Sequence, residues 1–357
     1  MDNPVTYRGT PNIALIKYWG KRDEKLILPC NSSISLTLEG KTRPVKGAHF
    51  DLYTTTSVLF SDKLKADELY INGQKQDLGD KDVAERFNVI SQLRERAGNK
   101  SHVLVVSNNS FPSASGLASS ASGMATLVCA VSKALGLKLS EKELSIIARQ
   151  GSGSACRSIM GGIVKWEKGA LDDGSDSFAH QLYPASHWPD LKDIIAVVSS
   201  ARKKVSSRAG MAQTVRTSPL YKARQVVVEK HIASLEDALR RRNLPKLAET
   251  AMKDSNNMHA TMLDTTPPIM YMDDNSRAIV NAIEELNRDE GAAIAGYTFD
   301  AGANAHIITI DGNIAKVMNR IKGIEGIESI VVAGVGDGPE LLGKDESLID
   351  VRKLAPK

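Results

Sequence analysis

The chain has 357 residues, of which 42% are hydrophobic and 25% charged, with a formal net charge of +4, and this is the balance of a globular protein long enough for two domains. The positive charge is mild and scattered and aromatic residues make up only 5%, which argues against a nucleic-acid-binding protein and fits a small anionic substrate. The cysteines (Cys30, Cys129 and Cys156) lack the spacing of a disulfide framework or a metal site, no apolar stretch is long enough to cross a membrane, and the N-terminus lacks the features of a signal peptide. We therefore expect a cytoplasmic location.

The first sixty residues favour β-strands, and the segment Ser33–Leu38 alternates polar and apolar residues with a period of two. Lys17 stands within an apolar run. Because burying a lysine is costly unless an anion pairs with it, Lys17 is either paired with an acidic group or extends its ammonium to the surface. Further along, Asn72-Gly73 predicts a hairpin turn and residues 83–97 predict a helix.

The segment Pro112–Gly123 carries the strongest local signal, because it consists almost entirely of serine, alanine and glycine. It follows a strand pattern at His102–Ser107 and precedes a helix pattern at Met124–Leu135. A small-residue loop that opens a helix presents unpaired backbone N–H groups and the positive end of the helix dipole, which together suit phosphate. The segment has neither a Walker A nor a Gly-x-Gly-x-x-Gly pattern, and the alternative interpretation is a helix start that packs tightly against a strand.

The middle of the chain predicts a helix at Glu141–Gln150, with Ser140 as its N-cap and Glu143 completing a capping box. Strands are predicted at Ile163–Trp166 and Ile194–Val198. The segment between these strands, Gly169–Leu191, is rich in glycine, aspartate, serine and proline, so it predicts a loop and the softest candidate domain boundary.

The second half of the chain is richer in helices. Long amphipathic helices are predicted at Tyr221–Arg242 and Leu244–Thr261. The last hundred residues mix helices and strands, at Ser276–Asn287, Ile294–Phe299, His306–Ile310, Ile314–Ile321 and Ile327–Val335. This mixture lacks a regular strand–helix–strand alternation and therefore predicts an α+β fold of two lobes.

Three further stretches carry chemistry. Gly151–Ser158 surrounds Arg157 with glycine and serine, and its guanidinium either fits a carboxylate or phosphate or is an exposed arginine in a turn. Asp300 follows a strand pattern and precedes a small-residue turn, so it is either an Asx-turn residue or a carboxylate that faces a substrate. Lys203–Met211 offers more anion-binding groups or is a solvated basic loop. The seven histidines show no metal-ligand spacing, and we assign them no catalytic role.

Taken together, these stretches resemble the GHMP small-molecule kinases and, more narrowly, the diphosphomevalonate decarboxylases. Besides the loop at 112–123, the resemblance is carried in family order by Asn12–Lys21, Asn31–Ser33, Gly151–Ser158, Ser186–Pro189, Met252–Asn256, His259–Thr261, Leu263–Thr265 and Tyr297–Asn304. It implies a two-lobed GHMP kinase fold with the active site in the cleft. An N-terminal, ribosomal-protein-like α+β lobe would span residues 1–185, and a C-terminal ferredoxin-like lobe would span residues 186–357. It also implies ATP and Mg²⁺ as cofactors and a homodimer.

In the family that the chain resembles, ATP phosphorylates the tertiary 3-hydroxyl of mevalonate 5-diphosphate, and phosphate then leaves with CO2 to give isopentenyl diphosphate. The resemblance implies that Asp300 orients or deprotonates this hydroxyl, that Lys17 holds Asp300 ionised and offsets charge at the transferring phosphoryl group, and that Arg157 binds the substrate carboxylate.

The resemblance implies two further sets of site residues. Besides Arg157, those that would bind the substrate are Tyr18, Lys21, Ser152, Ser154, Ser207 and Arg208. Those that would bind the nucleotide are Ser113, Ser115, Gly116, Leu117, Ala118, Ser119, Ser120 and Met211. No residue is assigned as a certain metal ligand, since Mg²⁺ would be held by the ATP phosphates, with Ser120 as a candidate ligand.

Several related activities stay open at this point. Relatives act on mevalonate 5-phosphate, decarboxylate mevalonate 3,5-bisphosphate without ATP, or stop after 3-phosphorylation, and some GHMP proteins are ligand sensors without turnover. The sequence separates the alternative substrates poorly. An early-stopping kinase or a sensor would be expected to have lost catalytic residues, whereas Lys17, Arg157 and Asp300 are all present.

Overall fold

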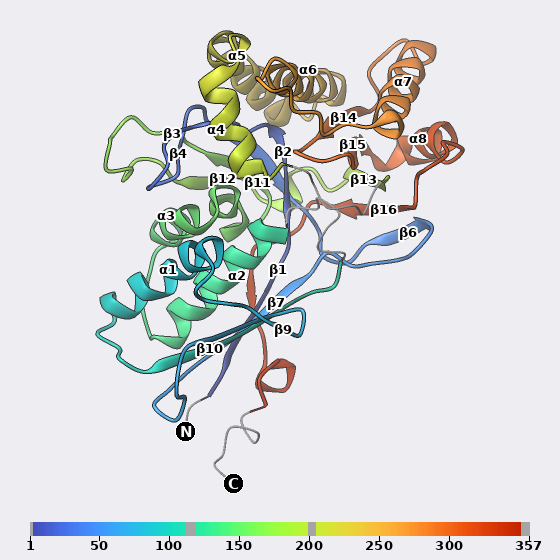
Figure 1. The fold of residues 1–357 in the computed structure, drawn as a ribbon. Coiled ribbons are helices and arrows are strands. Elements are labelled where there is room, and N and C mark those ends of the chain that lie inside the picture. The colour runs from blue at the N-terminus through green and yellow to red at the C-terminus, as the bar shows by residue number, and fades with distance from the viewer. Residues whose placement is uncertain (1–2, 112–118, 199–204, 351–357) are drawn as a thin grey trace.

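The computed structural model describes residues 3–111, 119–198 and 205–350 and has an α+β architecture of three larger β-sheets with helices packed on them (Figure 1). The first sheet has six strands in the order β17-β1-β7-β10-β8-β9. Its strands are β1 (Val5–Gly9), β7 (Thr54–Ser61), β8 (Glu68–Ile71), β9 (Gln74–Lys75), β10 (His102–Asn109) and β17 (Glu340–Leu341). Three helices, α1 (Lys81–Arg96), α2 (Ser119–Ala134) and α3 (Glu141–Gly151), share with it one buried apolar core.

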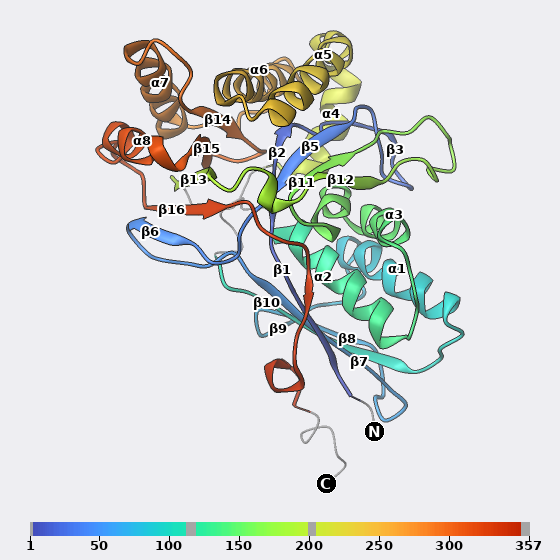
Figure 2. The ribbon, with the colours of Figure 1, turned by 180° about the vertical axis from the view of Figure 1, so that it is seen from behind.

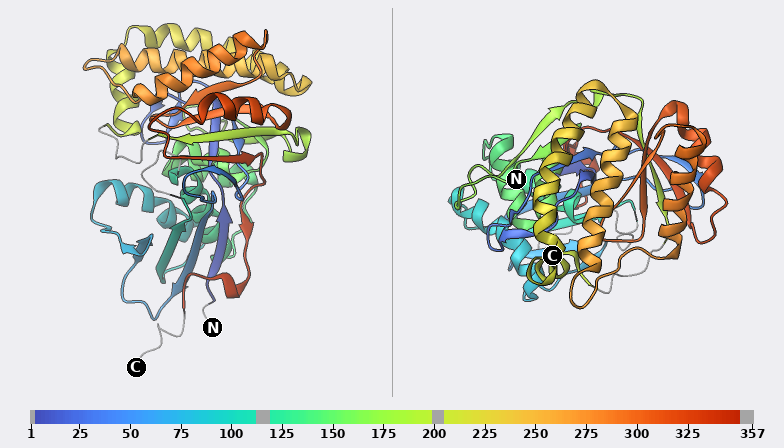
Figure 3. Two further views of the ribbon diagram at one scale, coloured as in Figure 1. Left: turned by 90° about the vertical axis from the view of Figure 1, so that its right-hand side faces the viewer. Right: turned by 90° about the horizontal axis from the view of Figure 1, so that it is seen from above.

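The second sheet has four strands in the order β12-β11-β5-β2. These are β2 (Asn12–Ile16), β5 (Ser33–Thr37), β11 (Ile163–Trp166) and β12 (Ala179–Tyr183). Every residue of β2 is buried although β2 is an edge strand, because helices α5 (Leu220–Arg241) and α6 (Leu244–Leu263) pack against it. These two helices run side by side (Figure 3).

The third sheet has five strands in the order β14-β15-β13-β16-β6. Its strands are β6 (Arg43–Lys46), β13 (Leu191–Val197), β14 (Gly296–Phe299), β15 (Ala305–Ile310) and β16 (Ser329–Gly334). Helices α7 (Asp274–Asp289) and α8 (Ile314–Ile321) share an apolar core with it, and a second core joins it to the four-stranded sheet, α5 and α6. The β2 edge and the β14 edge meet in the interior of the molecule, where Thr298 of β14 contacts the carbonyl of Ala14 of β2.

The two halves of the chain exchange short strands. β6 comes from the first half but pairs with β16, and β17 comes from the end of the chain but pairs with β1 (Figure 2). A division at residues 185 and 186 remains a prediction, and each half contributes one strand to a sheet of the other.

Several local predictions are confirmed. Ser140 and Glu143 form the predicted capping box at the start of α3. Asn72 and Gly73 both adopt positive φ angles, 50° and 77°, in the turn between β8 and β9, as a two-residue hairpin turn requires. Each of the predicted helices and strands named above is present, with ends that differ by a few residues.

Two local predictions are wrong. The expected loop at Gly169–Leu191 contains β12 and the short 3-10 helix η2 (Ala185–His187); β12 forms because it pairs with β11, which is a tertiary interaction. The interpretation of Lys203–Met211 as a basic loop is wrong from residue 207 onward, where helix α4 (Ser207–Thr217) begins with Ser206 as its N-cap.

The remaining elements are short. They are β3 (Lys21–Asp23), β4 (Leu28–Pro29), and the 3-10 helices η1 (Gly153–Ile159), η3 (Asp311–Asn313) and η4 (Lys344–Glu346). Of these, η1 matters most for the site, because it carries Arg157 against the four-stranded sheet.

Candidate active site

The three residues predicted to carry the chemistry come from separate elements that meet in the interior. Lys17 directly follows β2, Asp300 directly follows β14, and Arg157 lies on η1. Lys17 is 1% exposed, and its Nζ lies 2.6 Å from Oδ1 of Asp300, whose side chain is 35% exposed. The predicted pairing of a buried lysine with an acid is therefore confirmed, and the alternative in which Lys17 extends to the surface is wrong.

The electrostatics of this pair follow from its position. Burial lowers the pKa of Lys17, and the neighbouring Asp300 carboxylate opposes that effect. The Asp300 carboxylate is partly exposed and can therefore contact a ligand, whereas the Lys17 ammonium contacts this carboxylate from the buried side. The arrangement suits a base that must accept a proton beside a fixed positive charge.

Arg157 is also buried, at 3% exposure, and its partners are unusual for a buried cation. Its Nε donates to Oδ1 of Asn12 (3.2 Å) and to Oγ of Ser35 (3.1 Å), and a terminal nitrogen donates to Oγ of Ser33 (2.7 Å). All these acceptors are neutral, and in the described part of the chain no carboxylate lies within ion-pair distance of Arg157. Because a buried charge is costly without a counter-charge, this guanidinium is suited to an anionic ligand.

The residues that hold Arg157 explain the predicted alternation of β5. Ser33 and Ser35 lie two residues apart, so their side chains share one face of β5, and both serines are buried. The Asn12 amide is itself oriented by donating to Oγ of Ser158 (2.8 Å) and to the carbonyl of Ser154 (3.2 Å). The sequence assigned no role to Asn12, Ser33 and Ser35. The alternation of Ser33 and Ser35 with apolar residues is the pattern that could have indicated a polar partner for one face of β5.

Tyr18 packs on the segment that carries Ser152, Ser154 and Arg157, and Trp166 contacts both the Tyr18 ring and the Arg157 guanidinium. The Tyr18 ring packs against Trp166 with centroids 4.7 Å apart, and it lies so close to Gly153 that a Cβ there would be 2.8 Å from the ring. Burial raises the pKa of Tyr18, and its hydroxyl has no hydrogen-bond partner among the described residues. Lys21, 8% exposed, pairs with Glu24.

The remaining predicted residues lie further out or in packed positions. Ser207 and Arg208 begin α4, and the Arg208 guanidinium forms an ion pair with Glu85 of α1. Met211 packs in a buried cluster with Trp19, Tyr221 and Ala301, the last of which follows Asp300.

The predicted nucleotide-binding loop is only partly described. Ser119 and Ser120 open helix α2, whose first turn has no acidic residue, whereas Ser113, Ser115, Gly116, Leu117 and Ala118 lie outside the described residues. No group of three His, Cys, Asp or Glu side chains able to hold a metal ion occurs in the described ranges.

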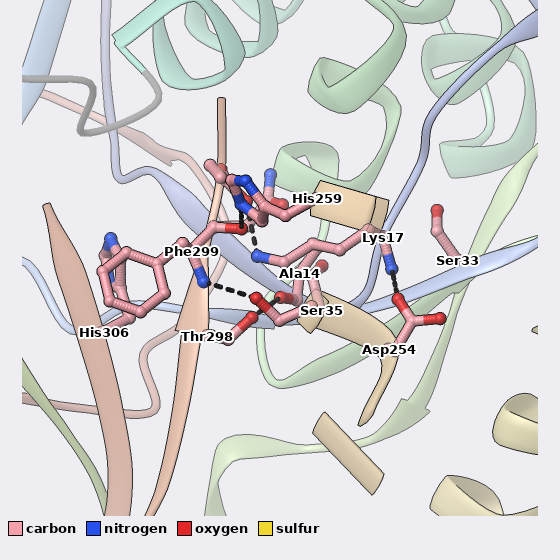
Figure 4. Close-up of polar contacts among 12 residues, drawn as sticks. Ala14, Lys17, Ser33, Ser35, Asp254, His259, Thr298, Phe299 and His306 are labelled. Atoms are coloured by element: carbon pink, nitrogen blue, oxygen red, sulfur yellow. Dashed lines mark hydrogen bonds and ion pairs between the residues drawn. The ribbon is translucent and has the colours of Figure 1, made fainter. Parts of the chain in front are cut away.

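Helix α6 supplies residues of the site that belong to the family motifs but to which the sequence assigned no role. His259 is 8% exposed, and its Nε2 lies 3.3 Å from the carbonyl oxygen of Phe299, the residue before Asp300 (Figure 4). Burial lowers the pKa of His259 to about 4, so it is neutral at pH 7. A carbonyl only accepts hydrogen bonds, so Nε2 carries the proton of this imidazole.

The fold and the site together define an α+β enzyme of the GHMP kinase fold, with a carboxylate–ammonium pair and a buried guanidinium in its interior. Residues 9–179 match the diphosphomevalonate decarboxylase-like N-terminal domain, and residues 193–330 match the mevalonate 5-diphosphate decarboxylase C-terminal domain. The chain belongs to the diphosphomevalonate decarboxylase family.

Individual relatives support this membership over the full length. The diphosphomevalonate decarboxylase of Debaryomyces hansenii is 41% identical, covering 96% of this chain and 95% of the relative, and that of Homo sapiens is 38% identical, covering 95% and 93%. The structure of mevalonate diphosphate decarboxylase from Staphylococcus aureus matches with a TM-score of 0.86 and 36% identity over 96% of this chain and 99% of that chain. A complex of a relative with MVAPP, AMPPCP and magnesium matches with a TM-score of 0.83 and 37% identity, covering 96% and 99%.

Within residues 3–111, 119–198 and 205–350, no helix is both long and apolar enough to span a membrane.

Proposed function

We propose that this chain catalyses the ATP-dependent decarboxylation of mevalonate 5-diphosphate to isopentenyl diphosphate. The single observation that carries the proposal is the meeting of the Lys17–Asp300 pair with Arg157, a buried cation whose hydrogen bonds to the described residues all go to neutral oxygens. A substrate with a hydroxyl to activate and a carboxylate to bind matches both parts. The family, whose curated relatives carry the name diphosphomevalonate decarboxylase, supplies the identity of the substrate.

The first step is phosphoryl transfer to the 3-hydroxyl. Asp300 accepts the hydroxyl proton at its exposed carboxylate while the hydroxyl oxygen forms a bond to the terminal phosphorus of ATP and ADP leaves. The Lys17 ammonium, 2.6 Å from Asp300, holds the carboxylate in place and offsets the negative charge that collects around the transferring group. Binding and orientation by buried residues supply most of the catalysis in such a reaction.

The second step breaks two bonds. The bond between C3 and the phosphate oxygen breaks with its electron pair going to phosphate, and positive charge develops on the tertiary carbon. The bond to the carboxyl carbon then breaks, its electron pair forms the new C=C bond, and CO2 departs. Arg157 binds the carboxylate in the ground state, and its anchoring by Asn12, Ser33 and Ser35 fixes the orientation of the breaking bond.

The nucleotide would be held at the start of α2. The helix dipole places partial positive charge at the start of α2, which begins at Ser119, and the first turn has no acidic residue to oppose this charge. This helix terminus is therefore suited to ATP phosphates. Ser119, Ser120 and the residues Ser113, Ser115, Gly116, Leu117 and Ala118 are proposed to contact the nucleotide, with Met211 near its base. Bound Mg²⁺ would neutralise phosphate charge, with Ser120 as the candidate protein ligand.

The substrate diphosphate is proposed to lie against Tyr18, Lys21, Ser152, Ser154, Ser207 and Arg208. Two observations support this placement. The Tyr18 hydroxyl has no partner among the described residues, and the Tyr18 ring packs directly on Gly153, the residue between Ser152 and Ser154 in the chain. Lys21 pairs with Glu24 and Arg208 pairs with Glu85, and each cation would bind the diphosphate in place of its carboxylate partner.

The experiment that tests the function is release of labelled CO2 from carboxyl-labelled mevalonate 5-diphosphate. We expect CO2, ADP, phosphate and isopentenyl diphosphate in equal amounts with the purified protein and Mg-ATP, and none with the Asp300→Asn variant. Absence of CO2 from the intact protein would refute the proposal.

We also propose a cytoplasmic homodimer with lobes at residues 1–185 and 186–357, as the resemblance to the family implies. Four apolar side chains are exposed: Val215, Leu220, Leu263 and Met270. Hydrogen bonds such as that from Leu220 N–H to Asp264 show that their segments are neighbours, and exposed apolar side chains on neighbouring segments support a contact between copies. Light scattering after size exclusion would test this state, and a monomeric mass at micromolar concentration would contradict it.

A further inference from the structure

Lys17 and Asp300 are 283 residues apart, and no β-ladder joins the strands that carry them. β2 is the edge strand of the four-stranded sheet, and β14 is the edge strand of the five-stranded sheet. Among the described residues, the direct polar link between these strands is one long contact, 3.5 Å from Oγ1 of Thr298 to the carbonyl of Ala14. The 2.6 Å separation of the catalytic pair must therefore be set by something that contacts both edges.

Helix α6 contacts both edges through side chains on one buried face. The N–H of Lys17 donates to Oδ2 of Asp254 (2.7 Å), and the N–H of Phe299 donates to Oγ of Ser255 (3.0 Å). His259 donates from Nε2 to the carbonyl of Phe299 (3.3 Å). Figure 4 shows Asp254 at the Lys17 backbone and His259 at the Phe299 carbonyl. The main chain of one catalytic residue, and that of the residue before the other, are thus bonded to a single rigid helix.

The Asp254 end of this face is itself held firmly. Asp254 is fully buried and forms an ion pair with Arg224 of α5 (3.2 Å), and Arg224 also donates to the carbonyl of Lys17 (3.1 Å). His231 contacts the same carboxylate at 3.1 Å, and Asn31 donates to the Lys17 carbonyl at 2.9 Å. Both backbone groups of Lys17 therefore have fixed partners.

We propose that the α6 face formed by Asp254, Ser255 and His259 is a positioning device that sets the distance between the Lys17 ammonium and the Asp300 carboxylate. Ser255 and His259 are positioning residues, because they act on Asp300 through the Phe299 main chain. Reactions that depend on placement lose rate when a reacting group shifts by fractions of an ångström. The inference rests on the proposed function for its kinetic readout, but the geometry it concerns does not.

The charged groups around Lys17 give a readout that a purely structural role would not change. Burial lowers the pKa of Lys17, Asp300 at the end of β14 and Asp254 on α6 oppose this shift, and Arg157 on η1 adds to it. Neutral His259 and the paired Arg224 complete the surroundings of Lys17. Moving Asp300 away from Lys17 would lower the Lys17 pKa further. The alkaline decline of kcat would move to lower pH with it.

The test compares Ser255→Ala with a matched control on the same helix, Thr250→Val. Thr250 is also buried and its hydroxyl bonds Ser234 (3.0 Å) and the Lys246 carbonyl (2.7 Å), away from the catalytic pair. We expect Ser255→Ala to lower kcat for mevalonate 5-diphosphate about tenfold with KM within twofold, and Thr250→Val to leave kcat within twofold. A second pair of variants separates the loss of the hydrogen-bond donor from the loss of the imidazole itself. His259→Gln keeps an N–H donor and should retain kcat, whereas His259→Leu has no donor and should lower kcat.

The Lys17 pKa, followed by the ¹³Cε shift of labelled lysine and assigned with Lys17→Arg, gives a measurement independent of turnover. We expect it to fall in Ser255→Ala and His259→Leu and to stay in Thr250→Val. If the parent protein does not turn over the substrate, the proposed function fails while this titration still tests the positioning. Unchanged kcat and an unchanged Lys17 pKa in folded Ser255→Ala and His259→Leu would overturn the inference.

Discussion

The burial of His259 has a measurable consequence for stability in acid. In the folded protein the His259 pKa is about 4, and in the unfolded chain it returns to the ordinary value of 6.5. Between these pH values the unfolded chain binds a proton that the folded protein does not bind. The free energy of unfolding therefore falls as the pH drops from 6.5 to about 4. Over the whole titration, His259 changes the free energy of unfolding by about 3 kcal/mol, and about 2.5 kcal/mol of this change falls between pH 7 and pH 4.5.

The assay is urea unfolding at several pH values between 4.5 and 7, followed by fluorescence of the buried Trp19, Trp166 and Trp188. Acidic groups also lose stability over this range, so the informative quantity is the difference between the parent protein and His259→Gln, which cannot titrate. As the pH falls from 7 to 4.5, we expect the free energy of unfolding of the parent protein to fall by about 2.5 kcal/mol more than that of the variant. The control is His180→Gln, since the His180 side chain is 41% exposed. Parallel pH profiles for the parent protein and His259→Gln would refute this reasoning.

Three further predictions concern the residues that we propose to be catalytic. Asp300→Asn should abolish turnover while substrate binding by calorimetry stays within about tenfold, and a collapse of binding would instead show that Asp300 is structural. Arg157→Gln should raise KM for mevalonate 5-diphosphate about 100-fold, equivalent to about 2.7 kcal/mol of lost charged hydrogen bonding, with KM for ATP little changed; an equal rise in both would contradict a carboxylate-binding role. Because burial lowers the pKa of Lys17 from its ordinary 10.5, kcat should decline on the alkaline side below that value, and in Lys17→Arg the decline should lie at higher pH. A decline at the same pH in Lys17→Arg would assign it to another group.

Features set by neighbouring residues could be predicted from the sequence. The Ser140–Glu143 capping box and the Asn72-Gly73 turn depend on chain-local hydrogen bonds and backbone angles, and both are present. The pairing of Lys17 with an acid could be predicted because an unpaired lysine in an apolar run is costly. The identity of that acid rested on the resemblance to the family.

Features set by distant contacts could not be predicted in the same way. Strand β12 lacks a run of β-branched residues and forms by pairing with β11. The roles of Ser33 and Ser35 depend on Arg157, more than 120 positions away, and no local pattern shows which side chain a serine will meet. The sequence presents Asp254, Ser255 and His259 only as members of family motifs, because their proposed positioning role depends on two strand edges that meet in space alone.

The most direct test of the central claim is product analysis with mevalonate 5-phosphate, mevalonate 5-diphosphate and mevalonate 3,5-bisphosphate, each with and without Mg-ATP. The site described above predicts isopentenyl diphosphate from the 5-diphosphate in the presence of ATP and no product from that substrate in its absence. Turnover of the 3,5-bisphosphate without ATP, or of the 5-phosphate in preference to the 5-diphosphate, would contradict the proposed substrate and the phosphoryl-transfer role of Lys17 and Asp300.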